Sequence, residues 1–272
     1  MSSPFDTEGL EATHKSSSPK AIVIKAPGTN CELESRDALI RAGADAIILT
    51  TPEIYKLPEL LLRARILLFA GGFAHGDDIA SARILANQFR LRLGDTLLRF
   101  INDEGGFALG ICNGFQALVK LGLLPRKDTT VLRQEVSLVH NDSGHYECRW
   151  VRMKVVDSPC LFLQKDTTLE MPVGHGEGKF VVGETFDSDL VALRYVDEEG
   201  RPATTYPANP NGSLSSIAGI TDPSGRVLGL MPHPDRSYLP YQHPQHHRRE
   251  IAEHEMGGAT LFHHLVEAAR HS

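Results

Sequence analysis

Short apolar runs alternate with amphipathic segments through the first half of the chain. Four runs are apolar except for a charged residue at one end of two of them, and they cover residues 21–25, 46–49, 65–69 and 107–111. Apolar side chains between these runs recur at helical spacing, which predicts helices at 32–42, about 84–101 and 113–121. Continuous apolar strands that alternate with helices predict a parallel sheet that is covered on both faces.

The pattern changes in the second half, where apolar and polar residues alternate. The alternating stretches, at 136–139, 148–155, 180–182 and 190–195, predict antiparallel strands with one solvated face. A continuous apolar run returns at 226–230, and the pattern at 257–270 predicts a closing helix. The expected fold class is therefore α/β, with a mainly parallel central sheet flanked by helices and an added antiparallel region.

The periodic pattern indicates a single domain over residues 21–272. Residues 1–20 are polar and rich in serine, and they lack the apolar core of a signal peptide, so we expect a disordered tail. Residues 237–256 are rich in histidine, proline and arginine, and we interpret this stretch as a surface insertion.

Composition argues against several classes of protein. The 272 residues carry a formal net charge of −6, with no sign of the concentrated basic face that binds nucleic acid. There is no run of about 18 apolar residues, the length that a transmembrane helix needs. The four cysteines lack CxxC spacing, so we expect neither a zinc ribbon nor a disulfide framework. Free thiols fit a reducing, cytoplasmic location.

The segment GICNG at residues 110–114 follows a predicted strand and opens a predicted helix. This is the pattern of a nucleophile elbow, in which small flanking residues permit a tight turn that projects the nucleophile above the sheet edge. Cys112 would lie at a helix N-terminus, where the dipole favours a thiolate, and the Asn113 amide would face a developing oxyanion. The alternative is a buried structural cysteine, which the strand before it and the helix after it disfavour.

A thiolate nucleophile needs a base, and the chain has 13 histidines. His233 follows the last predicted strand and lies between two prolines, which stiffen its backbone. Asp235 is two residues on, so in extended backbone both side chains point the same way and the carboxylate can accept the imidazole N–H. We therefore predict that Cys112, His233 and Asp235 are the catalytic residues.

A second oxyanion donor is expected from another turn that follows a strand. Gly71 and Gly72 come directly after the run at 65–69. A backbone N–H can approach a substrate closely only where side chains are absent. On this motif alone the alternative stays open that the paired glycines simply end the strand.

Seven short segments occur along the chain in a fixed order. They are PGTNCE (27–32), GGFAHGD (71–77), GICNGFQ (110–116), GLLP (122–125), HGEG (175–178), NPNGS (209–213) and MPHPDR (231–236). Together they resemble the glutaminase subunit of phosphoribosylformylglycinamidine synthase, a class I glutamine amidotransferase with a flavodoxin-like fold. The resemblance runs from about residue 21 to 236 and resumes near 261; GICNGFQ and NPNGS are more specific to this family than the bare elbow.

The resemblance implies a glutaminase that hydrolyses L-glutamine to glutamate and ammonia. Cys112 would form a thioester, His233 would move the protons, and Asp235 would orient His233. The oxyanion and glutamine-binding residues that it implies are Gly72, Phe73, Asn113 and Gln116, with Gly72 and Phe73 as alternative donors.

The same resemblance implies a partner. Ammonia would pass through a channel to a synthetase subunit, where ATP and Mg²⁺ would activate formylglycinamide ribonucleotide in de novo purine synthesis. No cofactor is expected in this chain, which lacks a GxxxxGK[ST] phosphate loop. His175 and Glu177 would lie near the glutamine site and the partner interface. Whether a small third subunit bridges the two is open.

Several positions depart from the family's pattern. Asp235 stands where a glutamate is usual, Ala70 replaces a proline and His75 replaces a tyrosine. Because the acid mainly orients the histidine, we expect activity to survive the shorter side chain. No metal is expected either: no cysteine or carboxylate cluster fixes a geometry for the histidines of the 237–256 stretch. We expect a solvated loop for them, that is, for His243, His246, His247 and His254.

Two other functions fit parts of the sequence. A stand-alone cysteine hydrolase of the same broad fold would share the elbow but would not need the His-Pro-Asp turn or NPNGS. A catalytically silent subunit that only positions a synthetase is suggested by Asp235 alone. Steady glutamine turnover by a reconstituted complex would eliminate the silent subunit.

Overall fold

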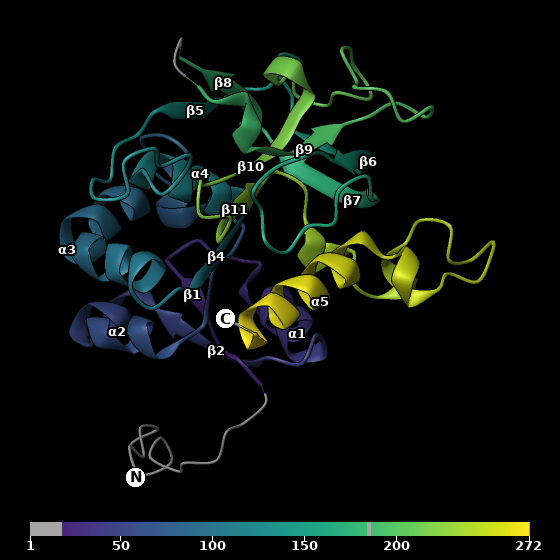
Figure 1. Ribbon diagram of the computed structural model, residues 1–272. Coiled ribbons are helices and arrows are strands. Elements are labelled where there is room, and N and C mark those ends of the chain that lie inside the picture. The colour runs from purple at the N-terminus through teal and green to yellow at the C-terminus, as the bar shows by residue number, and fades with distance from the viewer. Residues whose placement is uncertain (1–17, 184–185, 272) are drawn as a thin grey trace.

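A nine-stranded sheet forms the centre of the protein in the computed structural model, which describes residues 18–183 and 186–271 (Figure 1). Its strand order is β2-β1-β3-β4-β11-β10-β9-β6-β7. Of the predicted tail at 1–20, residues 1–17 lie outside the described residues. The first strand begins at Lys20, which is the last residue of that predicted tail. No helix within the described ranges has both the length and the apolar character needed to cross a membrane.

The first half of the sheet is parallel, as the sequence predicts. All four pairings among its five strands are parallel. Their side chains are largely buried on both faces, because helices cover the sheet on each side. The strands are β1 (Lys20–Lys25), β2 (Asp45–Thr50), β3 (Ile66–Phe69), β4 (Phe107–Ile111) and β11 (Val227–Leu230).

The other half of the sheet is antiparallel. It consists of β10 (Ile217–Thr221), β9 (Val191–Tyr195), β6 (Glu147–Val155) and β7 (Thr168–His175). A separate pair, β5 (Val136–Val139) and β8 (Lys179–Val182), is also antiparallel. The expectation of one solvated face is wrong for β9: four of its five residues are buried, because it lies between β10 and β6 inside the sheet.

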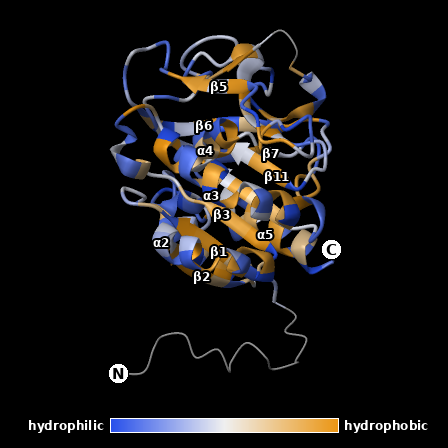
Figure 2. Cartoon of the chain, turned by 90° about the vertical axis from the view of Figure 1, so that its left-hand side faces the viewer, coloured by the Kyte–Doolittle hydropathy of each residue, from blue (hydrophilic) through white to orange (hydrophobic). Residues whose placement is uncertain are grey.

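In the part of the chain that the structure describes, five α-helices flank the sheet in two layers (Figure 1). On one side α4 packs on β3, β4 and β11 and contacts α3; on the other, α1 packs on β1 and β2 and contacts α5. The hydropathy colouring of Figure 2 follows this layering, with the hydrophobic residues concentrated on the strands. The helices are α1 (Glu32–Arg41), α2 (Thr51–Lys56), α3 (Arg83–Asn102), α4 (Asn113–Leu121) and α5 (Gly257–Arg270).

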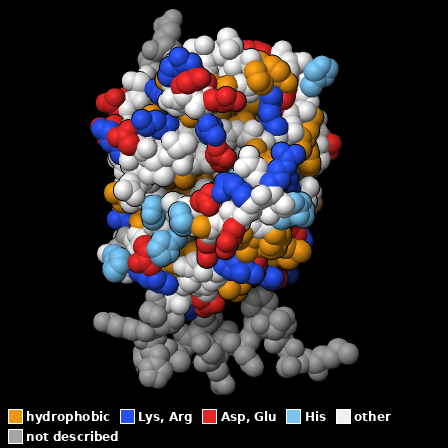
Figure 3. All heavy atoms as spheres, turned by 90° about the vertical axis from the view of Figure 1, so that its right-hand side faces the viewer, with side chains coloured by type: hydrophobic (Ala, Val, Ile, Leu, Met, Phe, Trp, Pro, Cys, Tyr) orange, Lys and Arg blue, Asp and Glu red, His pale blue; other side chains and the backbone are white. Residues whose placement is uncertain are grey.

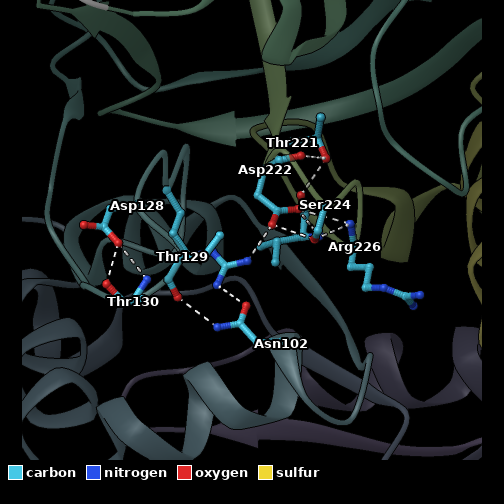
Figure 4. Close-up of polar contacts among 10 residues, drawn as sticks. Asn102, Asp128, Thr129, Thr130, Thr221, Asp222, Ser224 and Arg226 are labelled. Carbon is cyan, nitrogen blue, oxygen red and sulfur yellow. Dashed lines mark hydrogen bonds and ion pairs between the residues drawn. The ribbon is translucent and has the colours of Figure 1, made fainter.

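A buried ion pair joins the segment that follows α4 to the turn between β10 and β11. Arg126 donates to the Asp222 carboxylate at 2.9 Å, and both side chains are almost completely buried. Asp222 also accepts the Ser224 hydroxyl and the backbone N–H groups of Arg226 and Val227 (Figure 4). The carboxylate is thus fully satisfied, as a buried charge must be.

The stretch at 237–256 is not entirely solvated. His243 is 6% exposed, and its ring lies 5.2 Å from that of Trp150 in β6. Its Nε2 atom is 3.7 Å from the Glu170 carboxylate in β7. The expectation of a solvated loop is therefore wrong for His243, because part of the stretch packs against the end of the sheet. Figure 3 shows histidine side chains among acidic and basic ones on the face to which this stretch belongs.

Candidate active site

The loops that follow four parallel strands meet at one edge of the sheet. Residues 26–31 follow β1, residues 70–77 follow β3, Cys112 follows β4 and His233 lies just beyond β11. In open α/β sheets this edge, at the carboxyl ends of the strands, is where ligands bind. Strand order therefore brings together segments that are far apart in the sequence.

Cys112 has the geometry of a nucleophile elbow. It caps the N-terminus of α4 with φ +51° and ψ −105°, a backbone conformation that a non-glycine residue adopts only under constraint. A Cβ on Gly114 would overlap the Phe69 backbone, so the turn requires a glycine there. The Cys112 N–H donates to the Leu230 carbonyl at 2.9 Å, and the thiol donates to the Gly174 carbonyl at 3.5 Å. The nucleophile is thus fixed from both sides.

His233 and Asp235 form the predicted pair. Nδ1 of His233 lies 3.0 Å from Oδ1 of Asp235, and the two residues are 2% and 0% exposed. The other carboxylate oxygen of Asp235 accepts a hydrogen bond from the Ser35 hydroxyl at 3.1 Å. The backbone N–H of His233 donates to the Pro172 carbonyl at 2.8 Å. These bonds fix the ring and its acceptor, and the shorter aspartate still reaches the imidazole.

The electrostatics of His233 favour its protonated form. Burial lowers the pKa of His233, but the Asp235 carboxylate and the Cys112 sulfur outweigh it and hold that pKa well above its usual range. Nε2 of His233 has no hydrogen-bond partner among the described residues. Cys112 nevertheless lies close enough to raise the pKa of the ring. An imidazole with one nitrogen anchored and the other free near a thiol is arranged for proton transfer.

Two backbone N–H groups are free to bind an oxyanion. Gly72, with φ +133°, and Asn113, the first residue of α4, have no acceptor within the described parts of the chain. Phe73, the alternative donor, already donates its N–H to the Gly28 carbonyl at 3.0 Å. The geometry therefore favours Gly72 over Phe73 as the second donor.

The side chain of Gln116 has partners within the protein. Its Nε2 donates to the Glu177 carbonyl at 2.6 Å, and its Oε1 accepts from the Asn113 side chain at 2.9 Å. Gln116 is 4% exposed. The contact of Gln116 with glutamine remains a prediction. Within the protein, its side chain links the elbow residue Asn113 to the HGEG segment.

The HGEG segment lies beside the nucleophile. His175 ends β7 and is 3% exposed, with Nδ1 3.1 Å from Oδ1 of Asn141. Burial, followed by the nearby His233, lowers the pKa of His175 to about 4. The Glu177 side chain is partly exposed, and its carboxylate lies 3.9 Å from His140. Of the two side chains, only that of Glu177 is accessible to a ligand or partner.

Cys31 is a site residue that the sequence did not single out. It is 0% exposed, and its sulfur accepts from Arg236 at 3.0 Å. Burial raises the pKa of the Cys31 thiol, and the His233 side chain opposes that shift. Its only sequence signal is its place in PGTNCE, since the loops meet only in the folded sheet. Cys31, His233 and Asp235 are the one metal-competent trio within the described ranges. Each of these side chains already has a protein hydrogen-bond partner, so we assign no metal to them.

A family model described as "CobB/CobQ-like glutamine amidotransferase domain" matches residues 18–267. The chain belongs to the CobB/CobQ-like glutamine amidotransferase family. Among curated members it is 42% identical to phosphoribosylformylglycinamidine synthase subunit PurQ of Dehalococcoides mccartyi, over 92% of this chain and 98% of that one. It is 39% identical to PurQ of Methanococcus maripaludis, over 86% and 89%.

The fold is also that of solved amidotransferases. The structure of PurLQS from Thermotoga maritima matches with a TM-score of 0.67 and 26% identity, covering 92% of this chain and 98% of that one. A glutamine amidotransferase from the same organism matches with a TM-score of 0.55 at 17% identity, which bears on the fold alone. Both the family and the fold class expected from the motifs are confirmed.

Proposed function

We propose that this chain is the glutaminase subunit of a phosphoribosylformylglycinamidine synthase. It hydrolyses L-glutamine and passes ammonia to a synthetase, which converts formylglycinamide ribonucleotide to formylglycinamidine ribonucleotide with ATP in purine biosynthesis. The observation that carries the proposal is the buried arrangement of Cys112, His233 and Asp235 in a chain that aligns with nearly the whole of a PurQ relative.

The proposed reaction has two stages. The Cys112 sulfur forms a bond to the side-chain carbonyl carbon of glutamine; the C–N bond then breaks, and His233 gives its proton to the leaving ammonia. Water next attacks the thioester, transferring a proton to His233, and the S–C bond breaks to release glutamate. Asp235 keeps Nδ1 occupied throughout, so that Nε2 carries the moving proton.

Each stage passes through a tetrahedral intermediate with a negatively charged oxygen. We assign the N–H groups of Gly72 and Asn113 to this oxygen, because neither has an acceptor in the described part of the chain and both lie at the edge that carries Cys112. Preorganised donors of this kind contribute about 10²–10³ in rate each.

The synthetase partner follows from the relatives. The PurQ relatives are subunits of phosphoribosylformylglycinamidine synthase, and the similar Thermotoga maritima structure is that of PurLQS. ATP and Mg²⁺ are proposed to bind the partner, and the complex is proposed to work in the cytoplasm. Asp235 reaches His233 at 3.0 Å, which supports an active subunit over a silent one.

Reconstitution with a synthetase subunit tests this function. Glutamate release is measured with formylglycinamide ribonucleotide, ATP and Mg²⁺, for the native chain, for Cys112→Ala and for Cys148→Ala. Cys148 is exposed, so its variant is a matched control. We expect partner-dependent turnover that only Cys112→Ala abolishes. A native complex that uses free ammonia but releases no glutamate would refute the proposal.

A further inference from the structure

The side-chain amide of Asn113 connects the elbow to the loop that carries Gly72. We call residues 71–77 the oxyanion loop. Oδ1 of Asn113 accepts the backbone N–H of Ala74, two residues beyond Gly72, at 2.9 Å. Asn113 is 2% exposed, so this bond is shielded from water. The residue whose own N–H is one proposed donor therefore also holds the loop that supplies the other.

Asp77 determines which way this amide points. Nδ2 of Asn113 lies 3.0 and 3.2 Å from the two carboxylate oxygens of Asp77. An ionised carboxylate only accepts hydrogen bonds, so it selects the NH₂ end of the amide and leaves Oδ1 facing Ala74. Gln116 supports the same orientation, since its Oε1 accepts from Nδ2 at 2.9 Å.

The oxyanion loop needs such support because its backbone is strained. His75 and Asp77 have φ of +56° and +54°, and Ala82 at the start of α3 has φ of +56°. Left-handed conformations at non-glycine residues persist only where surrounding contacts enforce them. Oδ1 of Asp77 also accepts the Ala82 N–H at 2.8 Å, so one carboxylate joins the loop, α3 and the elbow.

We propose that Asp77 is a positioning residue that acts through Asn113 to hold the Gly72 N–H at the oxyanion site. The inference rests on the proposed glutaminase function and adds to it a residue that does not touch the substrate. A donor is effective only when it is fixed where charge develops, and a displacement of about 1 Å costs up to about 10²-fold in rate. Asp77 would thus affect the tetrahedral intermediates and not the nucleophilicity of Cys112.

The test compares Asp77→Asn with Asp78→Asn in the reconstituted complex. Asn tolerates a left-handed backbone, and its Oδ1 can still accept from Ala82 and from Asn113. Its NH₂, however, would replace the Oδ2 atom that lies 3.2 Å from Nδ2 of Asn113, so two donors would face each other there. Asp78 is an exposed neighbour outside these bonds, so its variant controls for charge. Three quantities are measured: glutamine kcat and KM, inhibition by glutamate γ-semialdehyde, and alkylation of Cys112 by iodoacetamide. The aldehyde forms a tetrahedral adduct with an oxyanion; alkylation does not.

We expect Asp77→Asn to lower kcat about tenfold or more, and to weaken aldehyde inhibition by a similar factor. KM and the alkylation rate should change less than about twofold, and Asp78→Asn should change nothing. Unchanged aldehyde inhibition, or an equal loss in alkylation, would overturn the inference. If the native complex turned over no glutamine, the proposed function would fail, while aldehyde binding, measured directly by titration calorimetry, would still decide the role of Asp77.

A double-mutant cycle with Asn113→Ala provides the second test. If Asp77 acts through the Asn113 side chain, the double variant should be no slower than Asn113→Ala alone. Additive losses would show that Asp77 acts by another route and would overturn the inference.

Discussion

Gly71 lies directly against the ring of His233. A Cβ at position 71 would come within 2.9 Å of Cε1 of His233 and within 3.3 Å of the Cys31 sulfur. Asp235 holds Nδ1 of the His233 ring, and the Pro172 carbonyl accepts the His233 backbone N–H. The ring therefore has little freedom to move away from position 71. The size of the residue at position 71 therefore sets where the base can sit.

Gly71→Ala should slow the enzyme without preventing folding. The added methyl must displace the imidazole by a few tenths of an ångström, and we expect kcat to fall about tenfold to a hundredfold. The measurement is steady-state glutamate release by the complex. Gly183→Ala is the matched control, since a Cβ there meets nothing within 4 Å. Equal kcat values for the two variants would contradict the packing argument.

Asp235→Asn should lower the pKa of His233. The carboxylate is the first of the groups that raise this pKa, and burial, which lowers it, would then act with less opposition. NMR titration of the His233 ring measures the change directly. We expect kcat to fall by at least about tenfold, because the amide can also select the wrong tautomer. Asp235→Glu should retain most activity; a pKa that did not move in Asp235→Asn would exclude this carboxylate as its cause.

His175 should make the fold sensitive to acid over a defined range. Burial, with His233, lowers its folded pKa to about 4, whereas an unfolded histidine has a pKa of about 6.5. As pH falls below about 6.5 the unfolded chain takes up the proton first. The stabilisation present above that pH is therefore lost progressively down to about 4, by about 3 kcal/mol in all.

Urea unfolding of His175→Gln at several pH values between 7 and 4 checks this. The variant should show a flatter pH dependence than the native chain, whereas His140→Gln, whose side chain is 84% exposed, should not. Parallel curves for His175→Gln and the native chain would show that His175 does not titrate as described.

Arg126→Met should destabilise the protein by about 3–5 kcal/mol, because it leaves the Asp222 carboxylate buried without its cation. The double variant with Asp222→Asn should recover part of this loss. Lys165→Met, which breaks an exposed pair with Asp157, should cost about 1 kcal/mol or less. Denaturant midpoints provide the measurement, and similar losses for the buried and exposed pairs would contradict the prediction.

The sequence predicted the parallel half of the sheet because each strand there is a continuous apolar run. It did not predict β7, whose pattern is interrupted by Pro172. Proline is tolerated because β7 is the edge strand, a property that depends on the whole sheet order. The strand β10, with Gly219 at its centre, also lacked a clear signal.

The candidate site was predictable where its chemistry is local. Cys112 lies in an elbow motif, and His233 and Asp235 are two residues apart, so short-range geometry was enough. The contacts of Cys31 with Arg236, and of Asp77 with Asn113, join residues that are distant in the sequence. These residues come close together only because of the strand order. The local pattern of apolar and polar residues around each of them does not predict the contact.

The position of β11 has a consequence for synthesis on the ribosome. Among the strands of the described residues it comes last in the sequence, yet it is inserted between β4 and β10, near the middle of the sheet. A nascent chain that ends before Leu230 leaves β4 without this neighbour, and Cys112 lacks both the carbonyl that holds its N–H and its base. A chain without this segment therefore lacks an assembled catalytic site, and hydrolytic activity requires that synthesis has passed Asp235.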